Sequence, residues 1–499
     1  MTTQANVDYN VDYNVDYEAV IGLEVHIQLK TRSKMFCSCD REYFDTEPNS
    51  HVCAICLGMP GMLPVVNEQA VAYTIMAGLA LGCDIPTHSK FDRKNYPYPD
   101  LVKGYQISQY DQPFCLGGKL DIEVDGEPRT VHLERIHLEE DTARLLHRDD
   151  GAEAYALIDV NRSGSPLMEL VTQPDMHSGA EASAFLHKLR RTMRYLQIAD
   201  ADMEKGQLRC DANVSIRPRG QEALGTKVEV KNMNSFRSVQ RAIEFEIERQ
   251  AQVLAEGGRI VQETRGYVDA TGVTVSQRSK EEANDYRYFP EPDIPPTVLD
   301  EATTQAIRAR MPELPDARRA RFESEYSLSP DEARTLTDSR ERSEDFEAAV
   351  RAAGGGLARP VALLFIGEVA RHLNELGQEA ELSETPVTPA HVAELAGLLE
   401  RREVTGTTAK EVLAIAFETG EMPAAIVEAR GLKAVSDEGA IDEIAARMIE
   451  ANPKAVEDYR SGKKSAIGFL VGQVMREAKG RADANTVSSL LRKRLDSGS

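Results

Sequence analysis

The sequence of 499 residues contains no tryptophan, and no part of it has the roughly 18–20 consecutive apolar residues that a membrane-spanning helix needs. No basic segment followed by an apolar one occurs at the N-terminus, which argues against a secretory signal. Cysteine is scarce: there are seven, an odd number, and none follows Cys210. This pattern argues against a disulfide framework. We therefore expect a protein of the reducing cytoplasm that has no membrane contact.

Basic residues are also fewer than acidic ones. The sequence has 59 lysines and arginines and 81 acidic residues, which gives a formal net charge of −22. A chain of this charge repels phosphate backbones on average, which excludes a general nucleic-acid coat protein. The segment 461–499 differs, since it carries eight basic and three acidic side chains. Any contact with nucleic acid is therefore expected to depend on a local patch such as this one.

Three kinds of sequence follow one another along the chain. Residues 1–17 contain Asn-Val-Asp-Tyr three times over, a low-complexity repeat that predicts a disordered leader. Residues 18–295 mix strand patterns with helical ones, which is typical of an α/β or α+β domain of catalytic size. A proline cluster near residue 295 marks a boundary, and the residue ranges beyond it have helical spacing, first over 296–404 and then over 405–499.

A strand pattern near the N-terminus carries the first candidate site. Apolar and polar residues alternate over 22–29, and residues two apart on a strand share a face. Glu24 and His26 are therefore neighbours on the polar face. A carboxylate beside an imidazole can bind a divalent metal or exchange a proton, whereas the simpler interpretation is a solvated strand face. Both interpretations stay open from this segment alone.

Acidic residues recur in three further segments, and a Glu within an apolar strand is costly to bury unless it is paired or bound to a cation. Together they offer the hard oxygen ligands that magnesium prefers when substrate phosphates complete its coordination. Each segment could equally lie on the surface, and sequence spacing does not show that they converge. The segments are Leu138-Glu139-Glu140-Asp141, Ser165–Val171 with Glu169, and Arg209–Val214 with Asp211 and Asn213.

Two other segments carry basic side chains that could contact a phosphate. The loop 91–100 is shaped by Tyr and Pro, and its Arg93 and Lys94 could meet a phosphate or a carboxylate, or could simply be exposed. Gly462-Lys463-Lys464-Ser465 is an incomplete phosphate loop, because Glu457 stands where the first glycine is required. The sequence also has neither a GxSxG nucleophile motif nor a Rossmann fingerprint, so any ATP site is of another type.

Four of the cysteines form two close pairs, Cys37-x-Cys39 and Cys53-x2-Cys56, separated by thirteen residues. Four thiolates in two pairs suit tetrahedral zinc. Because all four ligands would come from the protein, the zinc would be structural and not catalytic. His51 is a possible substitute ligand, and four free thiols are the alternative.

The order of these motifs resembles one family, the B subunits of the aspartyl/glutamyl-tRNA amidotransferases of the GatCAB type. The resemblance covers residues 18–499; it is most specific in the first half of the chain and looser in the helical half. The motifs that carry it are IGLEVHIQL (21–29), PGMLPVVN (60–67), FDRKNY (91–96), YQISQ (105–109), LRCDANV (208–214) and DYRYFPEPD (285–293).

The resemblance implies a fold class and a chemistry. The fold is α+β, with a mixed-sheet catalytic cradle domain, an insert for zinc at about residues 35–60, an all-helical domain and a helical tail. The chemistry is phosphorylation by ATP of the side-chain carboxylate of Glu or Asp on a mischarged tRNA, which needs magnesium and positioning more than a covalent nucleophile. The implied catalytic and magnesium residues are Glu24, His26, Glu140 and Glu169, with Lys94, Asp211 and Asn213 at the nucleotide.

The resemblance also implies partners. Ammonia made by an amidase (A) subunit attacks the activated carboxylate, and a belt (C) subunit completes a heterotrimer. The substrates are Glu-tRNA(Gln), Asp-tRNA(Asn) or both. The tail is implied to contact the tRNA body through its basic side chains, Lys463, Lys464, Lys479 and Arg481. Two alternatives stay open: a non-catalytic tRNA-binding scaffold, and a kinase that acts alone on a small acid.

Overall fold

The computed structural model describes residues 16–149, 151, 154–279, 286–377, 380–434, 438–478 and 480–497. The chain divides into a first unit that ends at Leu314 and a second that begins at Pro315. Of the expected leader, residues 1–15 lie outside the described ranges. Its last residue already belongs to the fold, since Tyr17 begins the first strand and pairs with Pro218.

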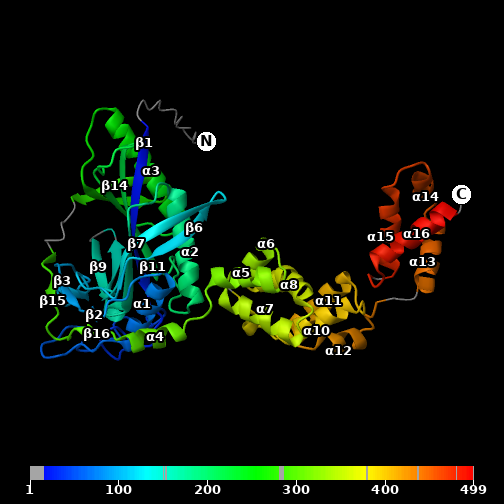
Figure 1. The fold of residues 1–499 in the computed structure, drawn as a ribbon, viewed down its shortest axis with the longest axis horizontal. Helices are drawn as coiled ribbons and strands as arrows, with labels where there is room; N and C mark the ends of the chain where they lie inside the picture. Colours follow the sequence, from blue (N-terminus) through cyan, green and yellow to red (C-terminus); the bar gives the residue numbers. More distant parts are fainter. Residues whose placement is uncertain are drawn as a thin grey trace. The chain divides into compact units, whose positions relative to one another are not determined.

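A nine-stranded sheet is the centre of the first unit (Figure 1). Its neighbours run in the order β14-β13-β12-β11-β1-β10-β7-β5, and β6 pairs with β7. All pairs are antiparallel except β12 with β13, so the sheet is mixed and the expected α+β fold is confirmed. The strands are β1 (Tyr17–Gln28), β5 (Cys115–Leu116), β6 (Lys119–Val124), β7 (Glu127–Glu140), β10 (Pro166–Thr172), β11 (Leu208–Pro218), β12 (Val228–Lys231), β13 (Glu263–Val268) and β14 (Val273–Ser279).

The two faces of this sheet have different environments. Helices α2 (Gly179–Tyr195) and α3 (Phe236–Ala255) run along one side of it, and each begins at a serine N-cap. Their apolar side chains share one core with Leu23, Val25 and Ile27 of β1. Because side chains alternate along a strand, Glu24 and His26 lie on the opposite face. The helices therefore cover the apolar face and leave the polar face to hold the candidate site.

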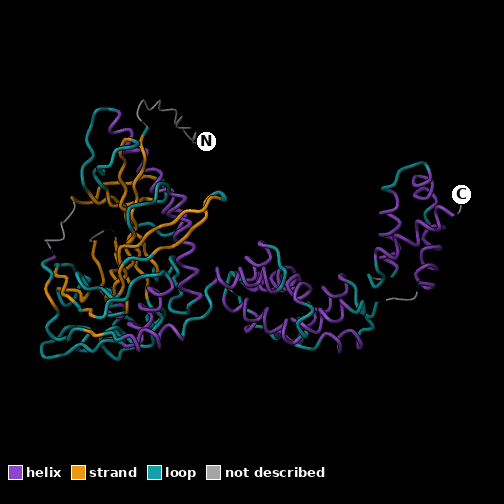
Figure 2. Tube along the Cα trace, viewed as in Figure 1, coloured by secondary structure: helices purple, strands orange, loops and turns teal. Residues whose placement is uncertain are grey.

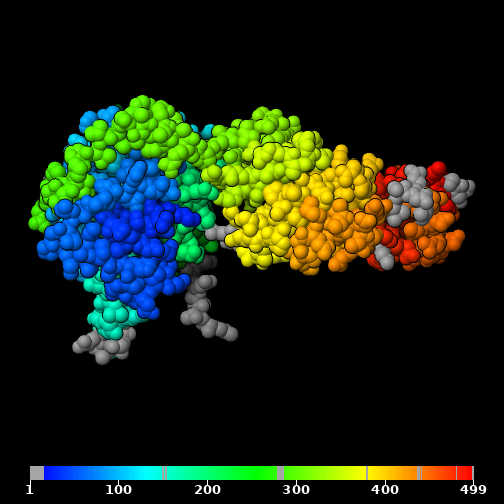
Figure 3. Space-filling view, turned by 90° about the horizontal axis from the view of Figure 1, so that it is seen from below, coloured from blue at the N-terminus to red at the C-terminus, as the bar shows by residue number. Residues whose placement is uncertain are grey.

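Smaller elements border the polar face. A three-stranded sheet joins β15 (Phe289–Pro290), β3 (Asp92–Asn95) and β4 (Tyr105–Ser108), and a two-stranded one joins β2 (His88–Ser89) and β16 (Thr297–Val298). The hairpin of β8 (Arg144–Asp149) and β9 (Ala154–Asp159) projects from the first unit (Figure 3). The helical elements here are α1 (Glu68–Ala80), the 3-10 turn η1 (Val160–Arg162) and α4 (Glu301–Ala309).

The first unit ends later than the proline cluster suggested. Thr297 pairs with Ser89, and the core of the first unit includes Leu299 and Ile307. The expected boundary at residue 295 thus falls inside the unit, because β16 and α4 fold back onto its sheets and core. Among the described residues, no helix is long and apolar enough to cross a membrane.

The second unit is helical (Figure 2) and contains two hydrophobic cores. The first core runs from Phe322 to Val427 and the second from Ile441 to Leu495, so the expected boundary at residue 404 falls within the first of them. Its helices are α5 (Pro315–Glu325), α6 (Pro330–Leu336), α7 (Arg340–Ala352), α8 (Ala358–Leu364), the π-helical turn η3 (Phe365–Val369), α9 (Ala370–Leu376), the 3-10 turn η4 (Leu382–Glu384), α10 (Pro389–Glu400), α11 (Gly406–Thr419), α12 (Pro423–Ala429), α13 (Glu438–Ala451), α14 (Pro453–Arg460), α15 (Ala466–Glu477) and α16 (Ala484–Ser497).

Candidate active site

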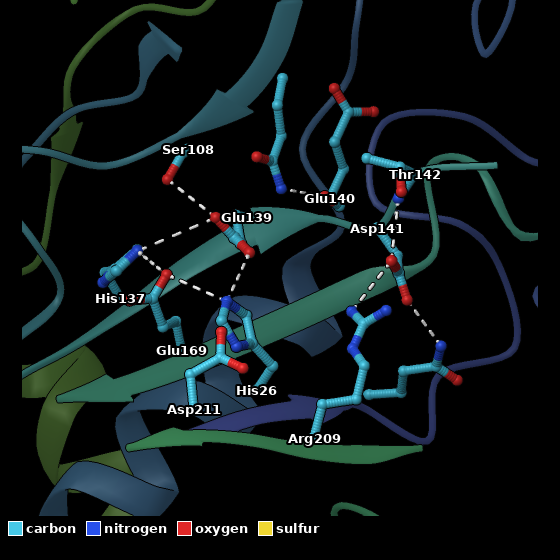
Figure 4. A network of polar contacts seen from close by, with 12 residues as sticks. His26, Ser108, His137, Glu139, Glu140, Asp141, Thr142, Glu169, Arg209 and Asp211 are labelled. Carbon is cyan, nitrogen blue, oxygen red and sulfur yellow. Dashed lines mark hydrogen bonds and ion pairs between the residues drawn. The ribbon is translucent and has the colours of Figure 1, made fainter. Parts of the chain in front are cut away.

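The polar face of the large sheet gathers charged side chains from four adjacent strands. Strand register aligns His137 of β7, Glu169 of β10, His26 of β1 and Arg209 of β11 in one row across the sheet. Glu139 lies two residues beyond His137 on the same face. Figure 4 shows the side chains of His26, His137, Glu139 and Glu169 directed toward one another, whereas Arg209 is directed toward Asp141. Long-range pairing of segments far apart in sequence therefore assembles the site.

His26, Glu139 and Glu169 form a cluster whose nitrogen and oxygen atoms lie within 4.8 Å of one another. The Nε2 atom of His26 is 3.3 Å from Glu169 Oε2 and 3.6 Å from Glu139 Oε1. The Ser108 hydroxyl donates to Glu139 Oε2 at 3.1 Å, which orients that carboxylate. One imidazole and two buried carboxylates are a fitting donor set for a divalent cation.

The charges of this cluster shift the pKa values of its members. Burial alone would lower the pKa of His26, but the neighbouring Glu169 and Glu139 carboxylates outweigh burial and raise the pKa above its ordinary 6.5. Burial would raise the pKa of Glu169, yet His137 and His26 hold it well below its usual range. Glu169 is thus an anion held between two imidazoles.

Glu140 does not join this cluster, which corrects the expectation that it shares a pocket with His26 and Glu169. Its carboxylate pairs with Lys103 and accepts the backbone N–H of Ile107 at 3.0 Å. Successive side chains on a strand point to opposite faces, so only one of Glu139 and Glu140 can face His26. Figure 4 shows Glu140 directed away from the cluster, with Glu139 in the place that was expected for Glu140.

Glu24 belongs to a second carboxylate group on the same face, together with Asp211 and Glu229. Asn213 donates to Glu24 Oε1 at 2.9 Å. The Lys231 ammonium pairs with Asp211 and lies 3.4 Å from Glu229 Oε1, so it neutralises part of the group's charge. Of the four expected magnesium ligands, His26 and Glu169 therefore lie in the first cluster, Glu24 lies in the second, and Glu140 lies in neither.

Lys94 lies on β3 among tyrosines from two segments. Its Nζ atom is 4.9 Å from the centre of the Tyr286 ring and 6.0 Å from that of Tyr96. Burial acts to lower the pKa of Lys94, but the negative charges of Glu139 and Glu169 outweigh burial and raise the pKa. The ammonium therefore stays charged beside the carboxylate cluster, where an anionic ligand would meet it.

The four cysteines of the loop between β1 and α1 converge as the sequence predicted, with all sulfur atoms within 4.8 Å of one another. Cys56 Sγ is 3.6 Å from Cys53 Sγ and 3.9 Å from Cys39 Sγ. A tetrahedral ion with bonds of about 2.3 Å needs sulfur atoms about 3.8 Å apart. The group is thus a four-cysteine metal site compatible with zinc, formed by Cys37, Cys39, Cys53 and Cys56.

The thiols of Cys39 and Cys56 differ in pKa. A hydrogen bond from Cys37 is the main cause that lowers the pKa of Cys56 to about 4, whereas burial raises the pKa of Cys39 to about 11. A bound cation would favour the thiolate form of all four. His51 contacts the Glu42 carbonyl through Nδ1 at 2.5 Å, and its own carbonyl accepts from Lys34. The Nδ1 contact thus holds the His51 imidazole against the loop backbone.

The basic residues expected to contact tRNA have unequal surroundings. Lys463 and Lys464 are exposed beside α15, and Lys463 Nζ lies 3.5 Å from Asp458. Arg481 instead donates a hydrogen bond to the Gly431 carbonyl at 3.0 Å. This bond links the second core of the unit to the segment that follows α12. Lys479 lies outside the described residues. Lys463 and Lys464 are therefore the better candidates for a phosphate contact.

Asp141 is a buried member of the acidic segment 138–141, which the sequence offered only as a source of oxygen ligands for magnesium. Its Oδ2 accepts from Gln28 at 2.7 Å, and its Oδ1 accepts from Arg209 at 3.0 Å and lies 3.7 Å from Arg162. Burial opposes ionisation, but Arg162 and Arg209 outweigh burial and lower the pKa of Asp141 to about 2. Its position directly after two glutamates at a strand end was the available signal.

We expect Asp141→Asn to lower the free energy of unfolding of the first unit by about 2 kcal/mol at pH 7. Because the folded pKa is depressed, the stabilising contribution is complete above about pH 4 and is lost as the pH falls toward 2. The difference in urea midpoint between the variant and the wild type should therefore be constant from pH 7 to about 4, narrow by pH 3 and disappear only as the pH falls below about 2. A difference that stays constant down to about pH 2 would contradict the charge-based origin.

Comparison with known proteins decides the family. The model of the GatB/GatE catalytic domain matches residues 19–305, and the model of the GatB domain matches residues 344–495. The chain belongs to the GatB family. The chain is also similar to curated proteins named as the B subunits of aspartyl/glutamyl-tRNA(Asn/Gln) amidotransferases. It is 50% identical to the one from Carboxydothermus hydrogenoformans over 479 residues, which cover 96% of this chain and 98% of that protein.

Two further GatB relatives agree with this assignment. The protein of the same name from Thermomicrobium roseum is 52% identical over 478 residues, covering 96% of this chain and 98% of that protein. The one from Dehalococcoides mccartyi strain 195 is 52% identical over 489 residues, covering 96% of this chain and 99% of that protein. The resemblance inferred from the motifs is thus confirmed. The catalytic-domain match contains both carboxylate groups of the polar face.

Proposed function

We propose that this GatB chain activates the side-chain carboxylate of Glu on tRNA(Gln), or of Asp on tRNA(Asn), by phosphorylation with ATP. Ammonia from a partner amidase (A) subunit would then replace the phosphate and give the amide, in a cytoplasmic heterotrimer completed by a belt (C) subunit. A carboxylate oxygen is a poor leaving group and a phosphate is a good one. The observation that carries this proposal is the convergence of His26, Glu139 and Glu169 inside the catalytic-domain match.

The side chains around this cluster have distinct parts in such a reaction. His26, Glu139 and Glu169 would hold magnesium, while ATP supplies the phosphoryl group and the cation offsets its charge. Lys94, which stays charged beside Glu139, would attract the phosphates. Asp211 and Asn213, with Glu24, lie on the same face and would contact the nucleotide. Positioning and charge account for the chemistry, so no nucleophile is needed.

ATP cleavage should require the mischarged tRNA. We expect phosphate release by the assembled enzyme to rise at least about 100-fold when Glu-tRNA(Gln) or Asp-tRNA(Asn) is added, and to stay low with correctly charged or uncharged tRNA. A coupled phosphate assay with each tRNA in turn measures this. Rapid phosphate release without tRNA would favour a kinase that acts alone. Tight binding of the mischarged tRNA with neither ATP cleavage nor amide formation would favour a non-catalytic scaffold.

We further propose that the four-cysteine site holds structural zinc. Four protein ligands leave no open position for a substrate, and the sulfur separations of 3.6 and 3.9 Å suit tetrahedral bonds. The loop that carries the cysteines also contributes Lys34, whose buried ammonium donates to the His51 carbonyl at 2.7 Å. Zinc would therefore fix this loop against the first unit without entering the reaction.

The tail should add affinity for tRNA and not chemistry. We expect Lys463→Ala combined with Lys464→Ala to raise the KM for mischarged tRNA by roughly 3- to 10-fold and to reduce the salt dependence of binding by about two ions. Initial rates at several salt concentrations measure both effects. Lys410→Ala, an exposed lysine paired with Glu368 outside this patch, serves as the control. Equal salt slopes for all three proteins would show that the tail lysines do not contact phosphates.

A further inference from the structure

Four tyrosine side chains form a row of ring contacts beside the carboxylate cluster. The rings of Tyr110 and Tyr288 are stacked, with their centres 4.4 Å apart and their planes at an angle of 10°. Tyr288 meets Tyr286 edge to face at 6.0 Å, and Tyr286 meets Tyr96 in the same way at 5.7 Å. The Nζ atom of Lys94 lies 4.9 Å from the centre of the Tyr286 ring. This tyrosine row therefore leads from Tyr110 to the ammonium that would attract phosphates.

The inner part of the tyrosine row lies beside the charges of the cluster. Burial is the largest cause that raises the pKa of the Tyr288 hydroxyl to about 12, while the Lys94 ammonium acts in the opposite direction. The negative charges of Glu139 and Glu169 act in the same direction as burial. The Tyr288 hydroxyl is therefore protonated at neutral pH, and a ligand that follows the row inward meets the cluster.

The outer end of the row is an exposed ring on a fixed backbone. Tyr110 is 50% exposed, although Tyr288 covers one face of its ring. Its backbone N–H donates to Oδ2 of the buried Asp92 at 3.0 Å, and Asp92 pairs with Lys90. Among the described residues, Tyr288 is the one aromatic side chain stacked on Tyr110. The ring is thus held in place and has surface left for a ligand.

The small three-stranded sheet sets the position of this ring relative to the cluster. Tyr110 comes two residues after Ser108, the last residue of β4, whose hydroxyl donates to Glu139 Oε2 at 3.1 Å. Phe289 of β15 pairs with Arg93 of β3, and the stacked partner of Tyr110 directly precedes it. Strand pairing therefore fixes both rings of the stack, so that little conformational entropy is lost when a ligand binds.

We propose that Tyr110 is the stacking surface for an adenine base of a substrate. This inference rests on the proposed function, in which ATP and the 3′-terminal adenosine of the charged tRNA both present adenine. A nucleobase stacks on an aromatic side chain through its flat face, which is the surface that an exposed ring on a fixed backbone offers. A base on Tyr110 would direct the rest of the ligand along the tyrosine row toward Lys94 and the cluster.

The fluorescence of 2-aminopurine, which stacking quenches, tests the proposal and distinguishes the two sources of adenine. The chain has no tryptophan to interfere with the signal. One probe is 2-aminopurine riboside triphosphate, and the other is mischarged tRNA with 2-aminopurine at its 3′ end. We expect the assembled enzyme to quench one of them. In Tyr110→Leu this quenching should disappear, and the KM of the matching substrate, ATP or tRNA, should rise roughly 5-fold or more. The other KM and kcat should stay within about 3-fold, which shows that the variant is folded.

Tyr110→Phe keeps the ring and should retain both the quenching and the KM. Tyr155→Leu is the matched control, because Tyr155 on β9 is 49% exposed and lies outside the tyrosine row. It should behave like the wild type.

Full quenching in Tyr110→Leu, or its loss in Tyr110→Phe, would overturn the proposal. A wild-type enzyme that cleaves ATP with mischarged tRNA but quenches neither probe would overturn this proposal alone. A wild-type enzyme that neither cleaves ATP nor quenches a probe would overturn the proposed function as well.

Discussion

Replacing Glu139 by Gln is expected to lower kcat/KM for tRNA-dependent ATP cleavage at least about 100-fold, which corresponds to about 2.7 kcal/mol. Glu139 faces His26 and Glu169, so the change removes a negative oxygen donor from the cluster while it keeps the side-chain shape. Ser108 can still donate to the remaining carbonyl oxygen. Steady-state phosphate release with mischarged tRNA measures the effect.

Glu140→Gln is the matched comparison, because the two residues are adjacent on β7 and face opposite sides. This variant leaves the buried Lys103 ammonium without its anionic partner, which is expected to cost roughly 3 kcal/mol of stability. Its rate per folded molecule should stay within about 3-fold of the wild type. If Glu140→Gln lost the activity and Glu139→Gln kept it, the assignment of Glu139 to the centre would be wrong.

Replacing Cys53 by Ser should abolish the proposed zinc binding at the four-cysteine site and lower the melting temperature of the first unit by roughly 10 °C. The sulfur of Cys53 lies 3.6 Å from that of Cys56, and three remaining thiolates hold the ion much less tightly. The ion is expected to be structural, so phosphate release at low temperature should fall by no more than about 3-fold. Metal analysis and thermal unfolding, followed by circular dichroism, measure the two effects.

Cys83→Ser provides the control for this substitution. Cys83 is a buried thiol outside the four-cysteine site, and its side chain donates to the Gly117 carbonyl at 2.9 Å, a contact that serine can keep. We expect full zinc content in this variant. Wild-type protein that contains four titratable thiols and no zinc would refute the zinc site itself.

Some of the site was predictable from short-range patterns. The alternation over residues 22–29 placed Glu24 and His26 on one polar face, and β1 has that arrangement. The spacing of the two cysteine pairs predicted a common site, and their sulfurs converge within 4.8 Å. Both inferences succeeded because the side chains involved lie within one strand or one loop, where local geometry alone determines their relation.

Glu139 and His137 could not be assigned in this way because β7 changes phase. Val131 and Leu133 face the core, and unbroken alternation would send His137 and Glu139 to the core as well. The register with β10 shifts between Val171 and Thr172, so Val171 pairs with Arg135 but Thr172 pairs with Leu133. The extra residue in β7 forms a β-bulge. After the bulge, each side chain of the strand points to the face opposite to the one that unbroken alternation would give it.

Motifs in short segments were enough to suggest the family, and that resemblance implied the α+β class. Local spacing and period-two alternation predicted the cysteine site and the polar face of β1, because these are properties of short segments. Which acid joins His26 could be established only in the folded chain, since the β7 bulge and the pairing of β7, β10 and β1 depend on contacts between distant segments. The end of the first unit at Leu314 likewise depends on contacts between distant segments. Prolines mark a local break, whereas the packing of β16 and α4 on the core decides which unit they join.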